Sequence, residues 1–141
     1  METFNHPLRL FQFCPKCGSG HFIENNKQSK RCEACGFVLY FNPKGAVVGI
    51  ITNEKGDILV CRRAKEPAKG MLDLPGGFMD SFETAEEAVV REVLEETGVQ
   101  MEIDRLGFVH EIYFYGDAPS KRNKLVYEIS LIFYMKVPDT F

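Results

Sequence analysis

Apolar residues gather in short runs over most of the chain, and these runs predict strands. Residues 46–52 (AVVGIIT) form one run, the polar stretch NEKGD follows, and residues 58–63 (ILVCRR) form the next run. Two such runs separated by a turn predict a hairpin. Beyond residue 99 the sequence is again strand-like, in MEIDRLGFVHEIYFY and LVYEISLIFYMKV, with a polar break between these two segments.

One segment, residues 85–97, has the period of a helix instead. Its apolar members, which we expect to face the core, are Val89, Val90, Val93 and Leu94. Thr84 and Glu87 predict a capping box at the start of this helix, and Gly98 predicts its end. Strands on both sides of a helix predict a mixed α/β or α+β domain.

The N-terminal part carries a different signal, two matched pairs of cysteines. CPKCG and CEACG each place two residues between the cysteines and a glycine after them. Four thiolates from two such turns suit a tetrahedral Zn²⁺, and a redox pair or two disulfides is the alternative. Because protein ligands fill all four positions, such a site is structural rather than catalytic. The predicted zinc ligands are Cys14, Cys17, Cys32 and Cys35.

Composition limits these elements to one ordinary domain with a small appendage. The chain has 141 residues, of which 45% are hydrophobic, and a net charge of −3. We expect an N-terminal arm at 1–12, a zinc ribbon at 13–42 and the larger domain at 43–141.

No apolar run has the length of about 20 residues that spans a membrane, and the first residues lack the features of a signal peptide. We therefore expect a cytoplasmic protein with neither a membrane partner nor, from its charge, a nucleic-acid partner. The remaining cysteine, Cys61, lies in an apolar run and is expected in the core.

The predicted helix also concentrates like charge. Glu92, Glu95 and Glu96 share one arc of it with Ala85 and Ala88. Like charges at this spacing destabilise a helix by a few tenths of a kcal/mol, and a solvated acidic face is the simpler interpretation. We favour a metal site, because the carboxylates adjoin one another, border the apolar arc and follow a Gly-Gly loop. Oxygen ligands on one face suit Mg²⁺ or Mn²⁺, which also bind waters and phosphate oxygens.

The spacing around this arc resembles the Nudix box, G-x5-E-x7-R-E-U-x-E-E-x-G-U, in which U is apolar. The matching residues are Gly77, Glu83, Arg91, Glu92, Val93, Glu95, Glu96, Gly98 and Val99. The cysteine pairs resemble the zinc ribbon that precedes some Nudix domains, including NADH pyrophosphatases. The resemblance implies an α/β/α Nudix fold, with a mixed sheet and the Nudix helix on one face. It also implies hydrolysis of a pyrophosphate bond in a nucleoside diphosphate linked to another group.

The resemblance further implies a division of roles. The catalytic residues it implies are Arg91, Glu92, Glu95 and Glu96, of which the three glutamates hold the divalent cation and Arg91 orients them. The Gly77 carbonyl helps to hold the cation, and Glu83 belongs to its outer shell. Some relatives use the glutamate at the position of Glu92 as general base, and others use one from a later segment. Glu111 and Glu128 are the later candidates here.

The sequence leaves the substrate open. The ribbon suggests NADH pyrophosphatase, but the Pro/Trp-rich signature of those enzymes is missing and the chain contains no tryptophan. Tyr115 fits a tyrosine found in dinucleoside-polyphosphate hydrolases, or it is an ordinary cross-strand aromatic residue. Arg62 and Arg63 are candidate phosphate contacts, or they only solvate a loop. The alternative function is a Nudix-fold nucleotide- or RNA-binding regulatory protein.

The last segment of the sequence raises one more expectation. The resemblance implies a second helix near the end of the domain, on the sheet face opposite the Nudix helix, and we predict no such helix after Val99. An uncovered aromatic face would be a large apolar patch for a monomer. We therefore expect either a sequence truncated at its C-terminal end or a homodimer.

Overall fold

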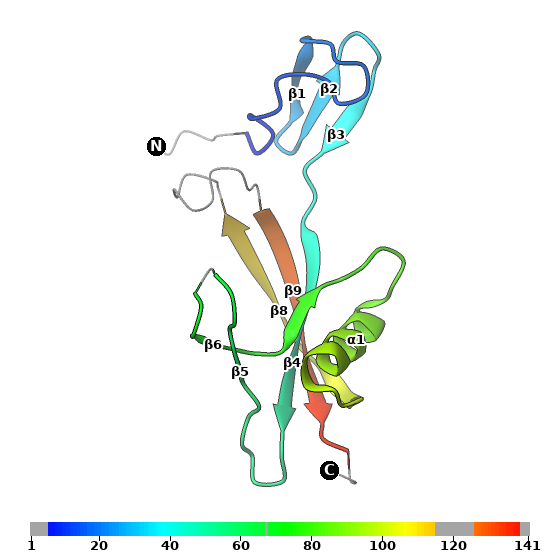
Figure 1. The fold of residues 1–141 in the computed structure, drawn as a ribbon. Helices are drawn as coiled ribbons and strands as arrows, with labels where there is room; N and C mark the ends of the chain where they lie inside the picture. The colour runs from blue at the N-terminus through cyan, green and yellow to red at the C-terminus, as the bar shows by residue number, and fades with distance from the viewer. Residues whose placement is uncertain (1–5, 67, 115–125, 139–141) are drawn as a thin grey trace. The chain divides into compact units, whose positions relative to one another are not determined.

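The computed structural model describes residues 6–66, 68–114 and 126–138 (Figure 1). These residues form two compact units, which divide between Pro43 and Lys44. The first unit is an antiparallel sheet in the order β1-β2-β3. Its strands are β1 (Phe22–Asn26), β2 (Ser29–Cys32) and β3 (Val38–Tyr40). Its core contains only Cys14, Phe22 and Cys32, with Phe37 and Leu39 packed against them.

The residues before the ribbon contact the same unit through hydrogen bonds. The buried His6 ring contacts the Asn26 carbonyl through Nε2 at 2.7 Å, and its Nδ1 accepts the Leu8 N–H. Lys30 Nζ donates to the Phe11 carbonyl at 2.6 Å. The contacts with Asn26 and Lys30 therefore hold this segment against a core too small to fix it by apolar burial alone.

The second unit contains a mixed sheet in the order β7-β4-β9-β8. Its strands are β7 (Gly76–Phe78), β4 (Lys44–Thr52), β9 (Val126–Lys136) and β8 (Glu102–Phe114). β4 pairs with β9 in parallel register and with β7 in antiparallel register. The short edge strand β7 therefore leads directly into the loop before the helix.

The predicted hairpin partner of β4 is largely wrong. Ile58 makes an isolated bridge to Thr52, and the chain then leaves the sheet. β5 (Cys61–Arg62) pairs instead with β6 (Leu72–Asp73) in a separate two-stranded sheet. Apolar composition predicted a strand at residues 58–63 correctly only in part, because it does not specify which neighbour a strand pairs with.

The helix α1 (Ala85–Thr97) has the predicted bounds, with the Thr84–Glu87 capping box and with Gly98 as its left-handed cap at φ 75°. Its buried face differs from the predicted arc. Ala88, Val89 and Val93 are fully buried, whereas Leu94 is 41% exposed. Gly49 on β4 faces Val93 of this helix, because a Cβ there would lie 3.2 Å from Val93 Cγ2. The missing side chain lets α1 pack closely on the sheet at Val93.

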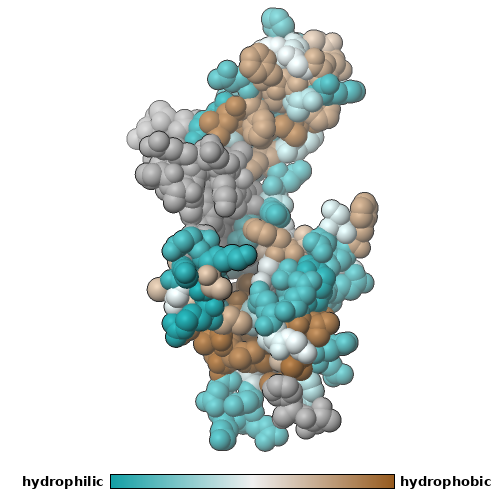
Figure 2. All heavy atoms as spheres, in the orientation of Figure 1, coloured by the Kyte–Doolittle hydropathy of each residue, from teal (hydrophilic) through white to brown (hydrophobic). Residues whose placement is uncertain are grey.

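α1 covers one face of the mixed sheet, and its outward face is hydrophilic in Figure 2. The core between helix and sheet contains Val47, Ile51, Ala88, Val89, Val93, Met101, Phe133 and Met135. In the described ranges α1 is the single helix, and it is too short and polar to cross a bilayer. Leu106 and Phe108 of β8 are half exposed. The expected truncation or homodimer remains a prediction.

Candidate active site

Two glycines of β7 bring the backbone of that strand against the carboxylates of α1. A Cβ on Gly77 would lie 2.6 Å from the Glu92 carboxylate, and one on Gly76 would overlap the Val47 carbonyl of β4. Only glycine therefore permits both close approaches. The Gly-Gly loop of the sequence thus fixes how near the helix carboxylates come to the strand backbone.

Arg91 organises most of the charge beside these glycines. Its guanidinium donates to Glu83 at 2.7 and 3.0 Å and to Glu92 at 3.0 Å. It reaches Glu95 at 3.3 Å and the Phe78 carbonyl at 3.2 Å. The hydrogen bonds from Arg91 lower the pKa of Glu83 to about 2, and the same bonds raise the pKa of Arg91. Both groups are therefore charged throughout the neutral range.

Arg91 has two glutamates one turn away on the helix, Glu87 and Glu95, but pairs with one of them. Of its two neighbours one turn away, only Glu95 is a partner. Glu87 is occupied by the capping box, in which its carboxylate accepts the Thr84 N–H at 3.2 Å. The loop residue Glu83 takes the place of Glu87, because β7 and the capping box turn that loop back toward the guanidinium.

Glu96 is held differently from the other two carboxylates. It accepts the backbone N–H of Gly76 at 3.2 Å and has no contact with Arg91 within the described residues. Burial raises its pKa, although the Gly76 N–H lowers it, and the charges of Glu92, Asp73 and Glu95 raise it further. A divalent cation would remove both the burial penalty and the repulsion among these carboxylates.

The donor chemistry of this group fits Mg²⁺ or Mn²⁺, although its geometry is open. Glu92 is 15% exposed and Glu95 is 58% exposed. Of the described residues, only the cysteine quartet brings three or more ligand atoms within 4.8 Å of one another. The carboxylates would therefore have to draw together around a cation, with Glu95 and Glu92 exchanging part of their contact with Arg91.

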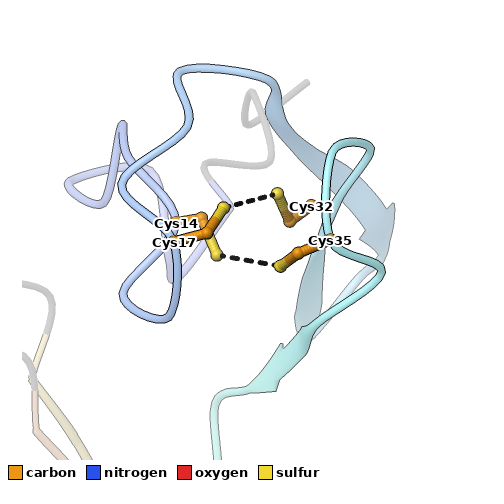
Figure 3. Close-up of side chains that lie close together, drawn as sticks. All are labelled: Cys14, Cys17, Cys32 and Cys35. Atoms are coloured by element: carbon orange, nitrogen blue, oxygen red, sulfur yellow. Dashed lines mark hydrogen bonds between the residues drawn. The ribbon is translucent and has the colours of Figure 1, made fainter.

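The cysteine quartet is closed and compact (Figure 3). Cys14 Sγ lies 3.7 Å from Cys35 Sγ, and Cys17 Sγ lies 3.6 Å from Cys32 Sγ. Four sulfurs placed about 2.3 Å from a tetrahedral Zn²⁺ stand about 3.8 Å apart, so the quartet fits that ion. Gly18 and Gly36 both have φ 79°, which closes the two turns. Free thiols, not disulfides, are present.

The pKa values of neighbouring cysteines in the quartet shift in opposite directions. The backbone N–H groups of Cys35 and Ala34 lower the pKa of Cys32 to about 6, against the effect of its burial. The pKa of Cys17 rises to about 12 although the Ser19 N–H lowers it, because the Cys32 sulfur beside it favours the protonated thiol. Adjacent thiolates repel one another, and a bound cation removes that repulsion.

The predicted substrate contacts are only partly brought together. Arg62 and Arg63 line a cavity of about 420 Å³ together with Glu96. Tyr115 and the side chain of Glu111 lie outside the described residues. Glu128 lies opposite Lys44 in the β4–β9 register.

The structure adds two residues that the sequence analysis missed. Asp73 and Leu74 line the same cavity, together with Lys65. Cys61 also lines it and is only half-buried, so its expected place in the core is wrong. Burial, with the charges of Glu96 and Asp73, raises the pKa of the Cys61 thiol. No local sequence pattern predicts this cavity, because the separate pairing of β5 with β6 creates it.

Comparison with known proteins agrees with this architecture. The family model for the NUDIX domain matches residues 42–139. A NUDIX hydrolase structure from Nitrosomonas europaea superposes with a TM-score of 0.68 at 29% identity, covering 91% of this chain and 68% of that one. A MutT protein from Methanosarcina mazei Go1 gives a TM-score of 0.55 at 30% identity, covering 71% and 68% of the two chains.

Two kinds of curated relative match the sequence. NAD-capped RNA hydrolase NudC of Vibrio parahaemolyticus is 28% identical over 116 residues, which are 82% of this chain and 41% of the relative. ADP-ribose pyrophosphatase of Methanocaldococcus jannaschii is 45% identical over 75 residues, which are 53% of this chain and 44% of the relative. The chain thus spans less than half the length of these relatives.

Proposed function

The chain belongs to the Nudix family, and from this premise we propose that it hydrolyses a pyrophosphate bond in a nucleoside diphosphate linked to another group. One observation carries the proposal. Two glycines of β7, Gly76 and Gly77, lie against Glu96 and Glu92, and Arg91 ties Glu92 to Glu95 and Glu83. An acidic helix face that served only for solubility would need neither the glycines nor the shared arginine.

The residues have separate tasks in this proposal. Glu92, Glu95 and Glu96 hold Mg²⁺ or Mn²⁺ with the Gly77 carbonyl, and Glu83 stands behind them. Once bound, the cation neutralises phosphate oxygens and polarises phosphorus. Arg91 keeps Glu92 and Glu83 in place through charged hydrogen bonds and does not itself contact substrate.

Hydrolysis needs a base as well as a cation. Water forms a new bond to phosphorus, the bond from phosphorus to the bridging oxygen breaks, and the displaced phosphate leaves. We assign the proton of that water to Glu92, with Glu111 and Glu128 as alternatives. Replacing each by glutamine and following the pH dependence of kcat separates the three, because loss of the base removes the acidic limb of the profile.

We propose that the four cysteines hold one structural Zn²⁺. The sulfur distances support this assignment. We further propose that residues 13–42 form the ribbon, preceded by an arm at 1–12, and that residues 43–141 form the Nudix domain. Metal binding would supply the folding energy that the small ribbon core lacks.

The activities named for two relatives supply two substrate candidates, NAD-capped RNA and ADP-ribose. The experiment is a panel of these two with NADH, nucleoside triphosphates, diadenosine polyphosphates and coenzyme A, in Mg²⁺ or Mn²⁺. Released nucleotide is measured by chromatography. We expect hydrolysis of at least one compound and its loss in excess EDTA. Intact protein that hydrolyses none of them, while binding nucleotide, would instead favour a regulatory binding protein.

A further inference from the structure

The cavity beside Glu96 is unlike a pocket for a nucleobase. Its volume of about 420 Å³ is within the range of about 300–1,000 Å³ that holds small molecules. Such pockets are usually lined by apolar and aromatic side chains, and bases usually stack on aromatic rings. None of the described residues that line this cavity is aromatic, and five of them carry charge. Figure 2 likewise shows hydrophilic residues over β5 and β6.

Positively charged side chains outnumber carboxylates in the lining of the cavity. The cationic residues are Arg62, Arg63 and Lys65, against the carboxylates of Asp73 and Glu96. Arg63 and Asp73 pair at 2.9 Å, which fixes the Arg63 guanidinium in place. Arg62 donates to the Gly70 carbonyl at 2.7 Å, a contact that orients its charge without neutralising it.

The remaining groups do not offset this charge. Neither Arg62 nor Lys65 forms an ion pair with any described residue. Cys61 contributes a neutral thiol, since burial raises its pKa. A bound divalent cation would neutralise the charge of Glu96, the one carboxylate of the cavity that is not paired with an arginine. Two guanidinium groups and an ammonium beside it would then meet the ligand, and these groups bind phosphate oxygens well.

We propose that this cavity holds phosphate groups of the substrate beyond the scissile pyrophosphate. The substrate class is therefore nucleotides with a chain of three or more phosphates, rather than diphosphates whose second group is an uncharged sugar. The inference rests on the proposed function, because it takes Glu96 as the residue beside the bond that is cleaved. The cations would position the charged chain, and the nucleoside would lie outside the cavity.

The experiment compares diadenosine tetraphosphate with ADP-ribose as substrates of the full chain in excess Mg²⁺. The variants are Arg62→Gln, Lys65→Ala and, as a matched control, Lys69→Ala, which alters the same loop outside the cavity lining. We expect kcat/KM to favour the tetraphosphate at least about tenfold, and Arg62→Gln or Lys65→Ala to lower that ratio about tenfold. Lys69→Ala should leave the ratio unchanged. Equal kcat/KM values, a preference for ADP-ribose, or equal losses on both substrates would overturn the inference.

A binding measurement keeps the inference testable if neither compound is hydrolysed. Inorganic tripolyphosphate is titrated calorimetrically into the wild-type chain and the same variants, again with Mg²⁺ in excess. Binding that weakens about tenfold in Lys65→Ala but not in Lys69→Ala supports the cavity as a phosphate site. Absent binding, or equal binding by both variants, rejects it. A chain that binds tripolyphosphate this way yet hydrolyses nothing would contradict the proposed function and leave the phosphate site standing.

Discussion

The cysteine quartet and the glutamate arc are two candidate metal sites made by opposite means. The sulfurs contact one another, at 3.6 and 3.7 Å, on two tight turns. The carboxylates are instead bound to other groups, Glu92 and Glu95 to Arg91 and Glu96 to the β7 backbone. The sulfurs already stand at the distances that a bound ion requires, which suits one resident ion. The carboxylates have alternative partners, which suits a cation that arrives with the substrate.

The chemistry of the donors agrees with this contrast. Thiolates are soft ligands that satisfy all four positions of Zn²⁺, which leaves none for a substrate. Carboxylates are hard ligands, and Mg²⁺ bound by a few of them retains positions for water and phosphate oxygens. The ribbon site is therefore closed by its own chain, and the helix site is completed from outside.

The largest expected effect is at the closed site. Cys32→Ser removes a fully buried sulfur and should lower the zinc content from about one per chain to near zero, with loss of the ribbon fold. Elemental analysis and amide exchange of the ribbon strands measure both effects. Cys61→Ser is the control, since Cys61 lies outside the quartet. Full zinc content in Cys32→Ser would show that the quartet is not the zinc site.

At the open site, Glu96→Gln should lower kcat/KM by more than about 100-fold, because ligand loss should exceed the 10–100-fold typical of outer-shell partners. The fold should remain, because the Gly76 N–H can still find an amide oxygen. Glu86→Gln, on the exposed first turn of α1, is the matched control. Zinc content must be unchanged in both variants. Wild-type activity in Glu96→Gln would refute the assignment of that carboxylate.

Arg91→Lys should have a smaller effect, a loss of about 10–100-fold in kcat/KM. An ammonium keeps the charge but cannot donate to Glu83, Glu92 and the Phe78 carbonyl at once. The apparent Mg²⁺ affinity should weaken in parallel, measured by titrating activity with Mg²⁺. If Lys preserves both quantities, Arg91 supplies charge alone and positions nothing.

The smallest effect is expected at Asp104, a carboxylate in neither site. Lys136, at 3.2 Å, and then Arg105 lower its pKa below the ordinary value of about 3.9. A carboxylate whose pKa is lowered in the folded state contributes stability above about pH 4. This contribution is lost as the pH falls through the folded-state pKa. Asp104→Asn should therefore lower Tm by a few degrees at most at pH 7, and this difference should shrink as the pH falls below about 4. A difference that grows on acidification would reverse this sign.

The sequence predicted some elements closely because their signals are local. The bounds of α1 follow from Thr84, Glu87 and Gly98, each acting within one turn. The cysteine turns are equally local, and their spacing alone indicated a shared ligand set. The Nudix box placed Gly77 and the glutamates in one group before any tertiary contact was known.

Tertiary contacts decided what the sequence did not predict. A helical wheel could not show that Val93 packs against the bare backbone of Gly49, or that Leu94 beside it is half exposed. The cavity depends on Cys61 and Arg62 pairing with β6 rather than returning along β4.

Arg91 has one more consequence, which concerns how this site tolerates change. Four carboxylates and one carbonyl share a single guanidinium, so removing any one partner frees donors for the others. The free-energy effects of substitutions at these partners will therefore not add. Substitutions at the partners of Arg91 are therefore coupled. A substitution that is harmful alone becomes tolerable once a second partner is also substituted. Epistasis among Asp80, Glu83, Glu92 and Glu95 is thus built into the geometry of one arginine.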